Sequence, residues 1–171
     1  GRWFLNTLYV ATMTCIIGTL LTILTGYVMS RFRFQGRDTI RKTTLLLGMF
    51  PGFMGMTAVY IIMGQLNLLN SLTALGVLYA TMQFPFAIFL LTGFLRSIPR
   101  DYEEAAMIDG CGPFRILTSI IIPMCKPGIV TVCMISAMAA WNEYPVALVM
   151  VTDPTKATLP VGLANLYEIQ R

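Results

Sequence analysis

Long apolar stretches alternate with short polar segments along this chain. No charged residue occurs within residues 3–30 or 43–95, and Glu143 is the only one within residues 127–152. A membrane-spanning helix needs roughly 20 apolar residues to cross about 30 Å of hydrocarbon. Each stretch is therefore long enough to span a bilayer, and the second is long enough to cross it twice.

The second stretch divides at a polar turn. Residues 65–71 read QLNLLNS, and the polar side chains of Gln65, Asn67, Asn70 and Ser71 suit a short connection between two helices. The pattern then predicts four spans in all, near residues 4–29, 44–64, 72–95 and 128–152.

The composition also indicates a membrane location. The chain has 171 residues, of which 56% are hydrophobic and 12% are charged. Soluble domains carry about 25% charged residues, roughly twice that fraction. The predicted fold class is therefore an all-α integral membrane protein, a polytopic helical bundle formed by residues 1–171 as one transmembrane domain.

Lysine and arginine are unevenly distributed among the polar segments. Residues 31–42 hold five basic residues and residues 96–126 hold four, whereas residues 65–71 hold none and the tail from residue 153 holds two. By the positive-inside rule, the first two segments face the cytoplasm and the other two face outside. Topology thus explains the net charge of +4, and we expect no nucleic-acid partner.

The side chains that enzymes use most often are scarce. The sequence has no histidine and no P-loop, G-x-S-x-G or H-E-x-x-H motif. We therefore expect no catalytic activity, no metal and no other cofactor. Cys15 and Cys133 fall within predicted spans, and Cys111 and Cys125 fall on the reducing side. With no C-x-x-C pair present, we expect all of them to be free thiols.

The most charged segment, residues 96–127, separates the third and fourth predicted spans. Pro99 bars an earlier helical run, and Asp101 with Glu104 three residues later indicates a helix start that resembles a capping box. Both acids then lie near the positive end of the helix dipole. The helix should run for about two turns, to Asp109.

Glycine and proline separate this helix from a second one. Gly110 is suited to end the first helix because glycine adopts the left-handed conformation at little cost. Pro113 favours the start of a second helix over residues 113–122, which should stop at Pro123. The segment is thus expected to be a pair of short helices on the cytoplasmic face.

The first short helix has a shallow surface. Ala105 and Ala106 leave room for the backbone of another protein to come close. The alternative is that residues 96–127 are a plain amphipathic connector.

The spacing of this segment resembles the EAA motif of the permease subunits of ABC importers. That motif reads EAA, three residues, Gly, nine residues and I-x-L-P. Here it is formed by Glu104, Ala105, Ala106, Gly110, Ile120 and Pro123. Ile122 stands where the motif has leucine, which is a conservative departure. The resemblance implies that these residues form coupling helices that dock on a cytoplasmic ATPase.

Other segments resemble the second permease subunit of maltose and multiple-sugar importers. They are 5-LNTLYVA-11, 27-YVMSRFRFQGR-37, 141-WNEY-144 and 159-LPVGL-163. Such subunits have six spans, so the resemblance places one helix before Gly1 and one after Arg171. It implies sugar import across a bacterial or archaeal inner membrane. The implied partners are an ABC ATPase dimer, a second homologous permease, an extracytoplasmic substrate-binding protein and the lipid bilayer.

Two other functions remain open at this point. An ABC importer permease for polyamines, phosphonates or peptides would carry the same loop. A secondary transporter or channel would need no ATPase. That alternative predicts more ion-coordinating residues within the spans than Glu143, and it leaves the EAA spacing unexplained.

Asn142 and Glu143 form a polar pair inside the last predicted span. An ionisable residue within a span is costly and indicates a polar path or a partner. One interpretation is that Glu143 lines or gates the translocation path. The other is that it lies near the outer interface or pairs with a neighbouring helix.

Prolines and small residues refine the predicted spans. Pro51, Pro85 and Pro145 should each kink a helix, and Gly18 and Gly26 should allow close helix packing. In the tail, residues 153–154 favour a turn and residue 160, a proline, favours a second break. The tail is either a connector or, by the resemblance, a surface that faces the substrate-binding protein.

Overall fold

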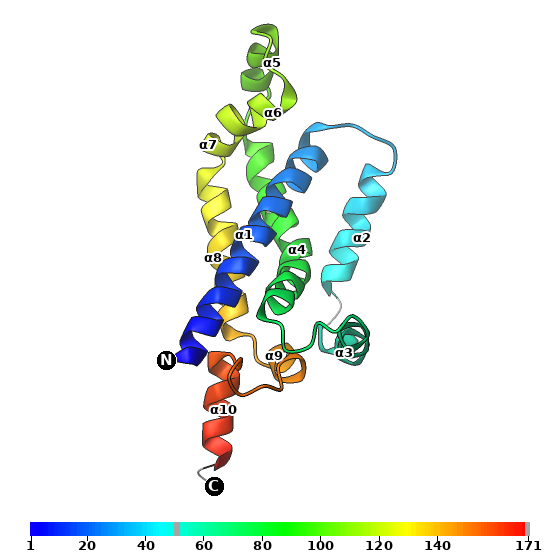
Figure 1. Ribbon diagram of the computed structural model, residues 1–171. Helices are drawn as coiled ribbons and strands as arrows, with labels where there is room; N and C mark the ends of the chain where they lie inside the picture. Colours follow the sequence, from blue (N-terminus) through cyan, green and yellow to red (C-terminus); the bar gives the residue numbers. More distant parts are fainter. Residues whose placement is uncertain (50–51, 170–171) are drawn as a thin grey trace.

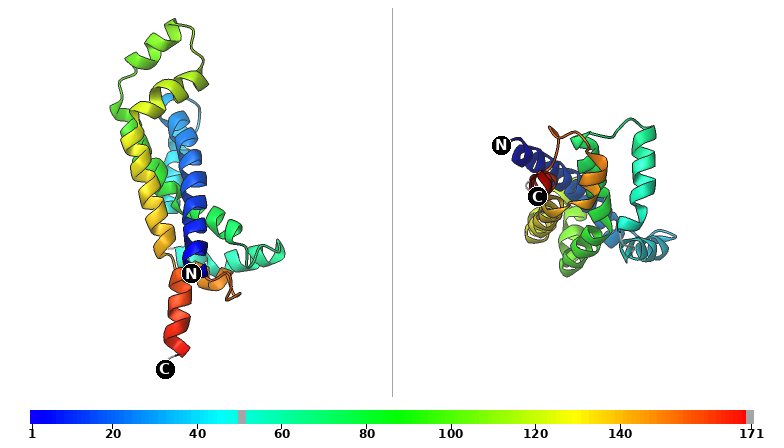
Figure 2. Two further views of the ribbon diagram at one scale, coloured as in Figure 1. Left: turned by 60° about the vertical axis from the view of Figure 1, so that its left-hand side comes forward. Right: turned by 90° about the horizontal axis from the view of Figure 1, so that it is seen from below.

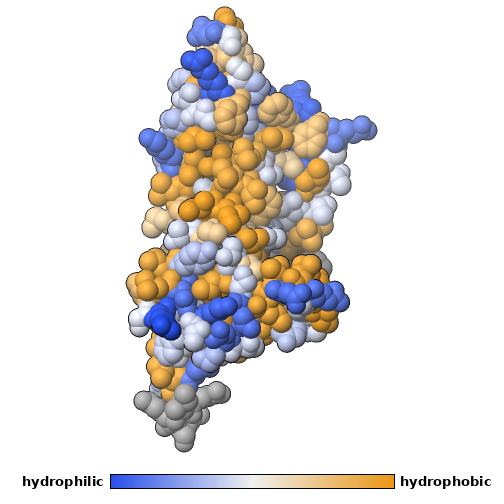
Figure 3. Space-filling view, viewed as in Figure 1, coloured by the Kyte–Doolittle hydropathy of each residue, from blue (hydrophilic) through white to orange (hydrophobic). Residues whose placement is uncertain are grey.

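A computed structural model describes the backbone of residues 1–49 and 52–169, and every regular element in that part of the chain is helical. Three long helices pack side by side as a bundle (Figure 1). They are α1 (Arg2–Arg31), α4 (Leu72–Ser97) and α8 (Lys126–Asn142). Hydrophobic residues cover the middle of this bundle, and hydrophilic ones gather toward both ends (Figure 3).

The two longest helices enclose the first and third predicted spans. Both α1 and α4 are long and apolar enough to cross a membrane. Ser71 begins α4 because its hydroxyl accepts a hydrogen bond from the Ala74 N–H (3.3 Å). At the other end of α4, Ile98 is extended because it precedes Pro99, and the helix stops.

Small residues bring these helices close together. A methyl group added at Gly18 would lie 3.6 Å from the Ala80 Cβ atom, and one at Gly76 would lie 3.0 Å from the Met13 Cβ atom. The Thr14 hydroxyl donates a hydrogen bond to the Gly76 carbonyl (3.1 Å), so α1 and α4 also share a polar contact. The close packing predicted at Gly18 is thus confirmed.

The second predicted span, residues 44–64, is not one helix. It contains the end of α2 (Arg37–Met49), a 3-10 turn, η1 (Gly52–Gly55), and most of α3 (Met56–Gln65). The glycines that bound η1 lower the helix propensity at the break. α2 lies beside α4, whereas α3 packs against α9 at the far end of the bundle. Pro51, a predicted kink, lies outside the described residues.

The fourth predicted span, residues 128–152, is also interrupted. α8 ends at Asn142, Glu143 is extended, and α9 (Pro145–Met150) follows. Pro145 therefore starts a new helix rather than bending a continuous one, because proline is favoured at the first helical position. Pro85, by contrast, lies inside α4, which remains one helix across it.

Two cysteines are joined rather than free. Cys15 of α1 and Cys133 of α8 form a disulfide, with their Cα atoms 5.1 Å apart. The prediction of free thiols at these positions is wrong. It rested on the absence of a nearby cysteine in the sequence, whereas packing of α1 against α8 brings together residues separated by 118 positions. Cys111 and Cys125 are free, as predicted.

The two segments predicted to face the cytoplasm, residues 31–42 and 96–126, lie at the same end of the bundle. α1 ends at Arg31 next to the short helices that follow α4, and the loop to α2 lies at the same end (Figure 1). We call this the basic end. The N-terminus, residues 66–71 and the start of α10 (Leu159–Ile169) lie at the opposite end (Figures 1 and 2).

Hydrogen bonds hold the loops together at the opposite end. The Asn70 side chain accepts from the Thr152 and Asp153 N–H groups (2.8 and 2.9 Å). The Thr7 hydroxyl accepts from the Leu159 N–H (2.7 Å), which fixes the start of α10 against α1. A break at Pro160 was predicted, but Pro160 lies in the first turn of α10, where its missing N–H costs no helical hydrogen bond.

Candidate functional site

A segment at the basic end projects beyond the long helices (Figure 2). Its first helix, α5 (Asp101–Ile108), follows Arg100, whose carbonyl accepts from the Glu103 and Glu104 N–H groups (2.8 and 3.0 Å). The prediction that Asp101 caps α5 is wrong, because Arg100 already has a helical conformation and makes Asp101 the first helical residue. The acids still lie in the first turn, where the helix dipole favours them.

The turn after α5 has the predicted glycine conformation. Gly110 has a φ of +80°, in the left-handed region, and apart from its own residue and its two chain neighbours no heavy atom lies within 4 Å of where its Cβ would be. Its N–H donates to the Met107 carbonyl (3.0 Å), and the Cys111 N–H donates to the Ala106 carbonyl (2.9 Å). These bonds satisfy carbonyls at the end of the helix, as in a glycine C-cap.

The second helical segment runs further than predicted. α6 (Pro113–Ile116) starts at proline as expected, a π-helical turn, η2 (Leu117–Ile121), follows, and α7 (Ile122–Met124) continues through Pro123. The prediction that the helix stops at Pro123 is wrong. The last hydrogen bond of the wider π turn runs from the Ile122 N–H to the carbonyl of Leu117, five residues earlier. It lies directly before Pro123, the residue that has no N–H to donate. The chain then bends by 78° into α8.

The predicted motif residues divide between two faces of this segment. Glu104 and Ala105 are exposed, whereas Ala106 is buried against the bundle. The prediction that Ala106 contributes to a shallow outer surface is therefore wrong, because successive helical residues point in different directions. Of the other motif residues, Gly110 and Pro123 are exposed and Ile120 is half-buried.

Large apolar side chains of α5 and α6 are exposed on this projection. We call them the apolar tip: Tyr102 (53% exposed), Met107 (56%), Ile108 (88%) and Phe114 (75%). Exposed acids, Glu104 and Asp109, lie among them in the sequence. Single exposed apolar residues are common, whereas several large ones gathered in one place are typical of interaction surfaces.

Beneath the apolar tip lies a buried ion pair that the sequence analysis missed. Arg31, the last residue of α1, pairs with Glu103 of α5, and their side chains are 8% and 6% exposed. The Arg31 guanidinium also donates to the Ile98 carbonyl (3.0 Å). From the sequence, Arg31 is one of five basic residues in segment 31–42, and nothing singles it out. No local pattern distinguishes Glu103 from the exposed Glu104.

Glu143 has partners on two helices. Its carboxylate accepts a hydrogen bond from the Tyr79 hydroxyl of α4 (2.8 Å) and from the Val146 and Ala147 N–H groups (3.2 and 3.3 Å). It therefore caps α9 and joins it to α4, which agrees with pairing to a neighbouring helix. Asn142 is exposed and bonds to its own helix through the Met138 carbonyl (2.8 Å).

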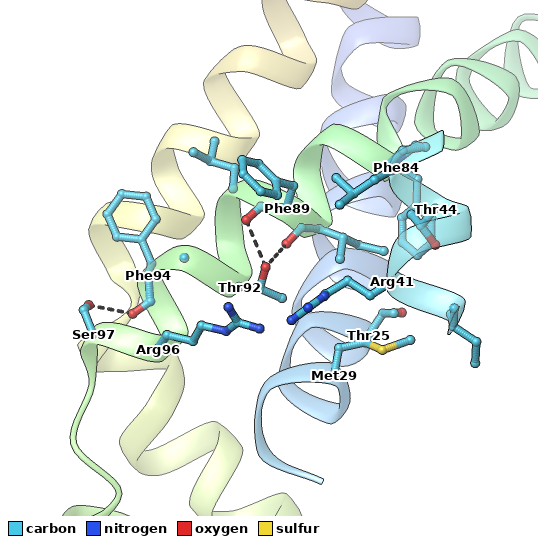
Figure 4. Close-up of a pocket in the computed structure, with 16 residues that line it drawn as sticks. Thr25, Met29, Arg41, Thr44, Phe84, Phe89, Thr92, Phe94, Arg96 and Ser97 are labelled. Carbon is cyan, nitrogen blue, oxygen red and sulfur yellow. Dashed lines mark hydrogen bonds between the residues drawn. The ribbon is translucent and has the colours of Figure 1, made fainter. Parts of the chain in front are cut away.

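A cavity of about 840 Å³ lies between α1, α2 and α4. Its walls are mostly apolar and include Phe84 and Phe89. Arg41 of α2 and Arg96 of α4 point toward one another at one side of it (Figure 4). Within the described residues, this groove is separate from the apolar tip.

The fold and this end of the bundle define a class: a polytopic helical membrane protein with short helices projecting past its long ones. Residues 16–168 match the family described as "Binding-protein-dependent transport system inner membrane component", and the chain belongs to that family. It is thus an inner-membrane component of a transport system.

Curated relatives of this chain are named as permeases. It is 36% identical over 163 residues to a sulfoquinovosyl glycerol transport system permease protein, SmoH of Agrobacterium fabrum, covering 95% of this chain and 57% of that protein. It is 34% identical over 164 residues to a diacetylchitobiose uptake system permease protein, NgcG of Streptomyces coelicolor, covering 96% and 54%. This chain therefore spans little more than half of these relatives.

A solved structure shares the fold. It is the crystal structure of a bacterial ABC transporter involved in the import of the acidic polysaccharide alginate. The TM-score is 0.86 at 26% identity, and the match covers 96% of this chain and 57% of that one.

Proposed function

We propose that the chain forms part of the translocation path of an ATP-driven sugar importer and that α5–α7 couple this path to a cytoplasmic ATPase dimer. Relatives named for the transport of sulfoquinovosyl glycerol, diacetylchitobiose and galactooligosaccharides support a carbohydrate substrate. The sequence contains no nucleotide-binding motif, so the partner ATPase supplies hydrolysis.

The main support for the coupling role is the exposure of the apolar tip. It stands beyond the long helices at the basic end, which faces the cytoplasm by the positive-inside rule. Protein interfaces typically combine an apolar centre with a polar rim. Ile108 and Phe114 can supply the centre, and Glu104 and Asp109 the rim.

The proposal also includes the membrane topology and the partner proteins. α1 and α4 each cross the membrane. Two further crossings are broken spans, one formed by α2 and α3 and the other by α8 and α9. A second homologous permease supplies the other half of the path, and Asn142, which is exposed next to Glu143, lies on that path. A substrate-binding protein docks at the opposite end, where residues 154–156 form an exposed turn.

The docking face can be tested by two substitutions in the full-length subunit, assembled with its partners. Ala105→Trp adds bulk on the exposed face of α5, so the ATPase should no longer co-purify in detergent. Gly110→Val strains a left-handed position by roughly 1–2 kcal/mol and should misdirect α6, with the same loss. Sugar uptake should fall in both.

A matched control distinguishes docking from general damage. Gly36 also has a positive φ, +89°, with nothing within 4 Å of its Cβ position, and it lies at the basic end outside α5–α7. Gly36→Val should keep the ATPase bound. If Ala105→Trp and Gly110→Val retain the ATPase and wild-type uptake, α5–α7 are not the docking site.

A further inference from the structure

We infer that Arg31 and Glu103 are positioning residues that fix α5 to the end of α1, so that movement of the docked ATPase reaches the transmembrane bundle. The inference rests on the proposed coupling role of α5–α7. It assigns a function to two residues that lie outside the EAA spacing.

The first argument is how little else holds α5. Its buried residues are Glu103 and Ala106. Ala106 offers only a methyl group to the core beneath it, which includes Tyr27 and Ile116. The ion pair therefore attaches one of the two buried α5 side chains, Glu103, to α1 rather than to a loop.

The second argument is that Arg31 joins three elements at one point. Its guanidinium contacts the Glu103 carboxylate of α5 and donates to the carbonyl of Ile98, the residue that ends α4. A reciprocal bond runs from the Arg100 guanidinium to the Ser30 carbonyl of α1 (3.4 Å). A movement of α5 is therefore transmitted through these contacts to the ends of both α1 and α4.

The third argument is energetic. A charge that is buried and loses its partner is strongly unfavourable, whereas replacing both members of a pair by apolar residues is often tolerated. Breaking this pair without exposing both groups to water is therefore costly. Such a contact stays closed while the helices that carry it move together.

The neighbouring acids should then have separable roles. Glu104 is exposed and lies on the docking face, whereas Glu103 is buried and faces α1. Substituting Glu104 should weaken ATPase binding. Substituting Glu103 should leave the docking face intact and interrupt transmission.

The test uses the complete transporter in proteoliposomes, with ATP hydrolysis and sugar uptake measured on the same sample. In Arg31→Met and in Glu103→Gln, the ATPase should still co-purify. Uptake per ATP hydrolysed should fall severalfold, because hydrolysis continues while movement of α5 no longer reaches α1. Arg33→Met, at an exposed arginine two residues away, should match the wild type, and Arg31→Lys should recover part of the coupling.

The double variant Arg31→Met/Glu103→Met covers the case in which the single variants do not assemble. It leaves no unpaired buried charge, so assembly should be normal while uptake per ATP stays low. Wild-type coupling in this double variant, or in both single variants, overturns the inference. Loss of coupling in Arg33→Met to the same extent also overturns it.

The same variants distinguish failure of the proposed ATPase docking from failure of the positioning role of Arg31 and Glu103. If Ala105→Trp keeps both ATPase binding and uptake, then α5–α7 do not dock the ATPase. If Ala105→Trp releases the ATPase while Arg31→Met and Glu103→Gln couple normally, docking stands and the positioning role alone is wrong.

Discussion

Replacement of Glu143 by alanine tests whether this residue joins α9 to the bundle. The Glu143 carboxylate caps α9 through the Val146 and Ala147 N–H groups and accepts the Tyr79 hydroxyl bond. Tyr79 is only 2% exposed, so no solvent replaces the lost acceptor. Glu143→Ala should therefore destabilise the subunit, and Glu143→Gln, which keeps an acceptor oxygen, should do so less.

The magnitude follows from the contacts that are lost. Loss of a helix N-cap costs about 1 kcal/mol. Leaving a buried hydroxyl without a partner costs about 1–3 kcal/mol. Glu143→Ala should therefore cost about 2–4 kcal/mol, and Tyr79→Phe, which removes the hydroxyl itself, about 1 kcal/mol. In the double variant no buried hydroxyl is left unpaired, so its cost should be less than the sum of the single costs.

The assay is thermal unfolding of the full-length subunit in lipid nanodiscs, followed by intrinsic fluorescence. Asn142→Ala is the control, because Asn142 is exposed and its side chain donates a hydrogen bond to the Met138 carbonyl of its own helix, α8. It should unfold near the wild-type midpoint. A wild-type midpoint for Glu143→Ala, or costs for the Tyr79 and Glu143 variants that simply add, would refute the structural role.

Two further predictions concern the cysteines. In denatured protein with its free thiols blocked, a maleimide reagent should react with Cys15 and Cys133 only after reduction, and their reaction before reduction would contradict the disulfide. A membrane-impermeant maleimide should label Cys111 only in permeabilised cells, and Cys125 more slowly, because it is buried and burial raises the pKa of its thiol. Labelling of either residue in intact cells would overturn the predicted orientation.

Local patterns predicted the long helices and the turn at Gly110 well. Apolar runs without charge identify α1 and α4 because hydropathy follows the cost of transferring each residue into lipid. Gly110 was predictable because few residues other than glycine adopt a positive φ cheaply. The interruptions within residues 44–64 and 128–152 were missed, because hydropathy measures transfer cost and not where the backbone breaks.

Long-range contacts escaped the sequence analysis for a different reason. The Cys15–Cys133 disulfide, the Arg31–Glu103 pair and the Tyr79–Glu143 bond each join residues that are far apart in the sequence. Their partners are set by which helices become neighbours, and no spacing within one segment reveals that. The EAA spacing likewise identified Ala106 as part of a motif but not that its methyl group faces the bundle.

The most direct test of the central claim is a photo-cross-linking probe at Ile108. Ile108 is 88% exposed in the apolar tip, so a benzoylphenylalanine there should capture the ATPase in the assembled transporter. The same probe at Ala58, exposed on α3 away from the basic end, should not capture it. An Ile108 adduct that contains the ATPase, absent from the Ala58 sample, is the predicted result. No ATPase adduct at Ile108, or equal adducts at both positions, would contradict docking at the apolar tip.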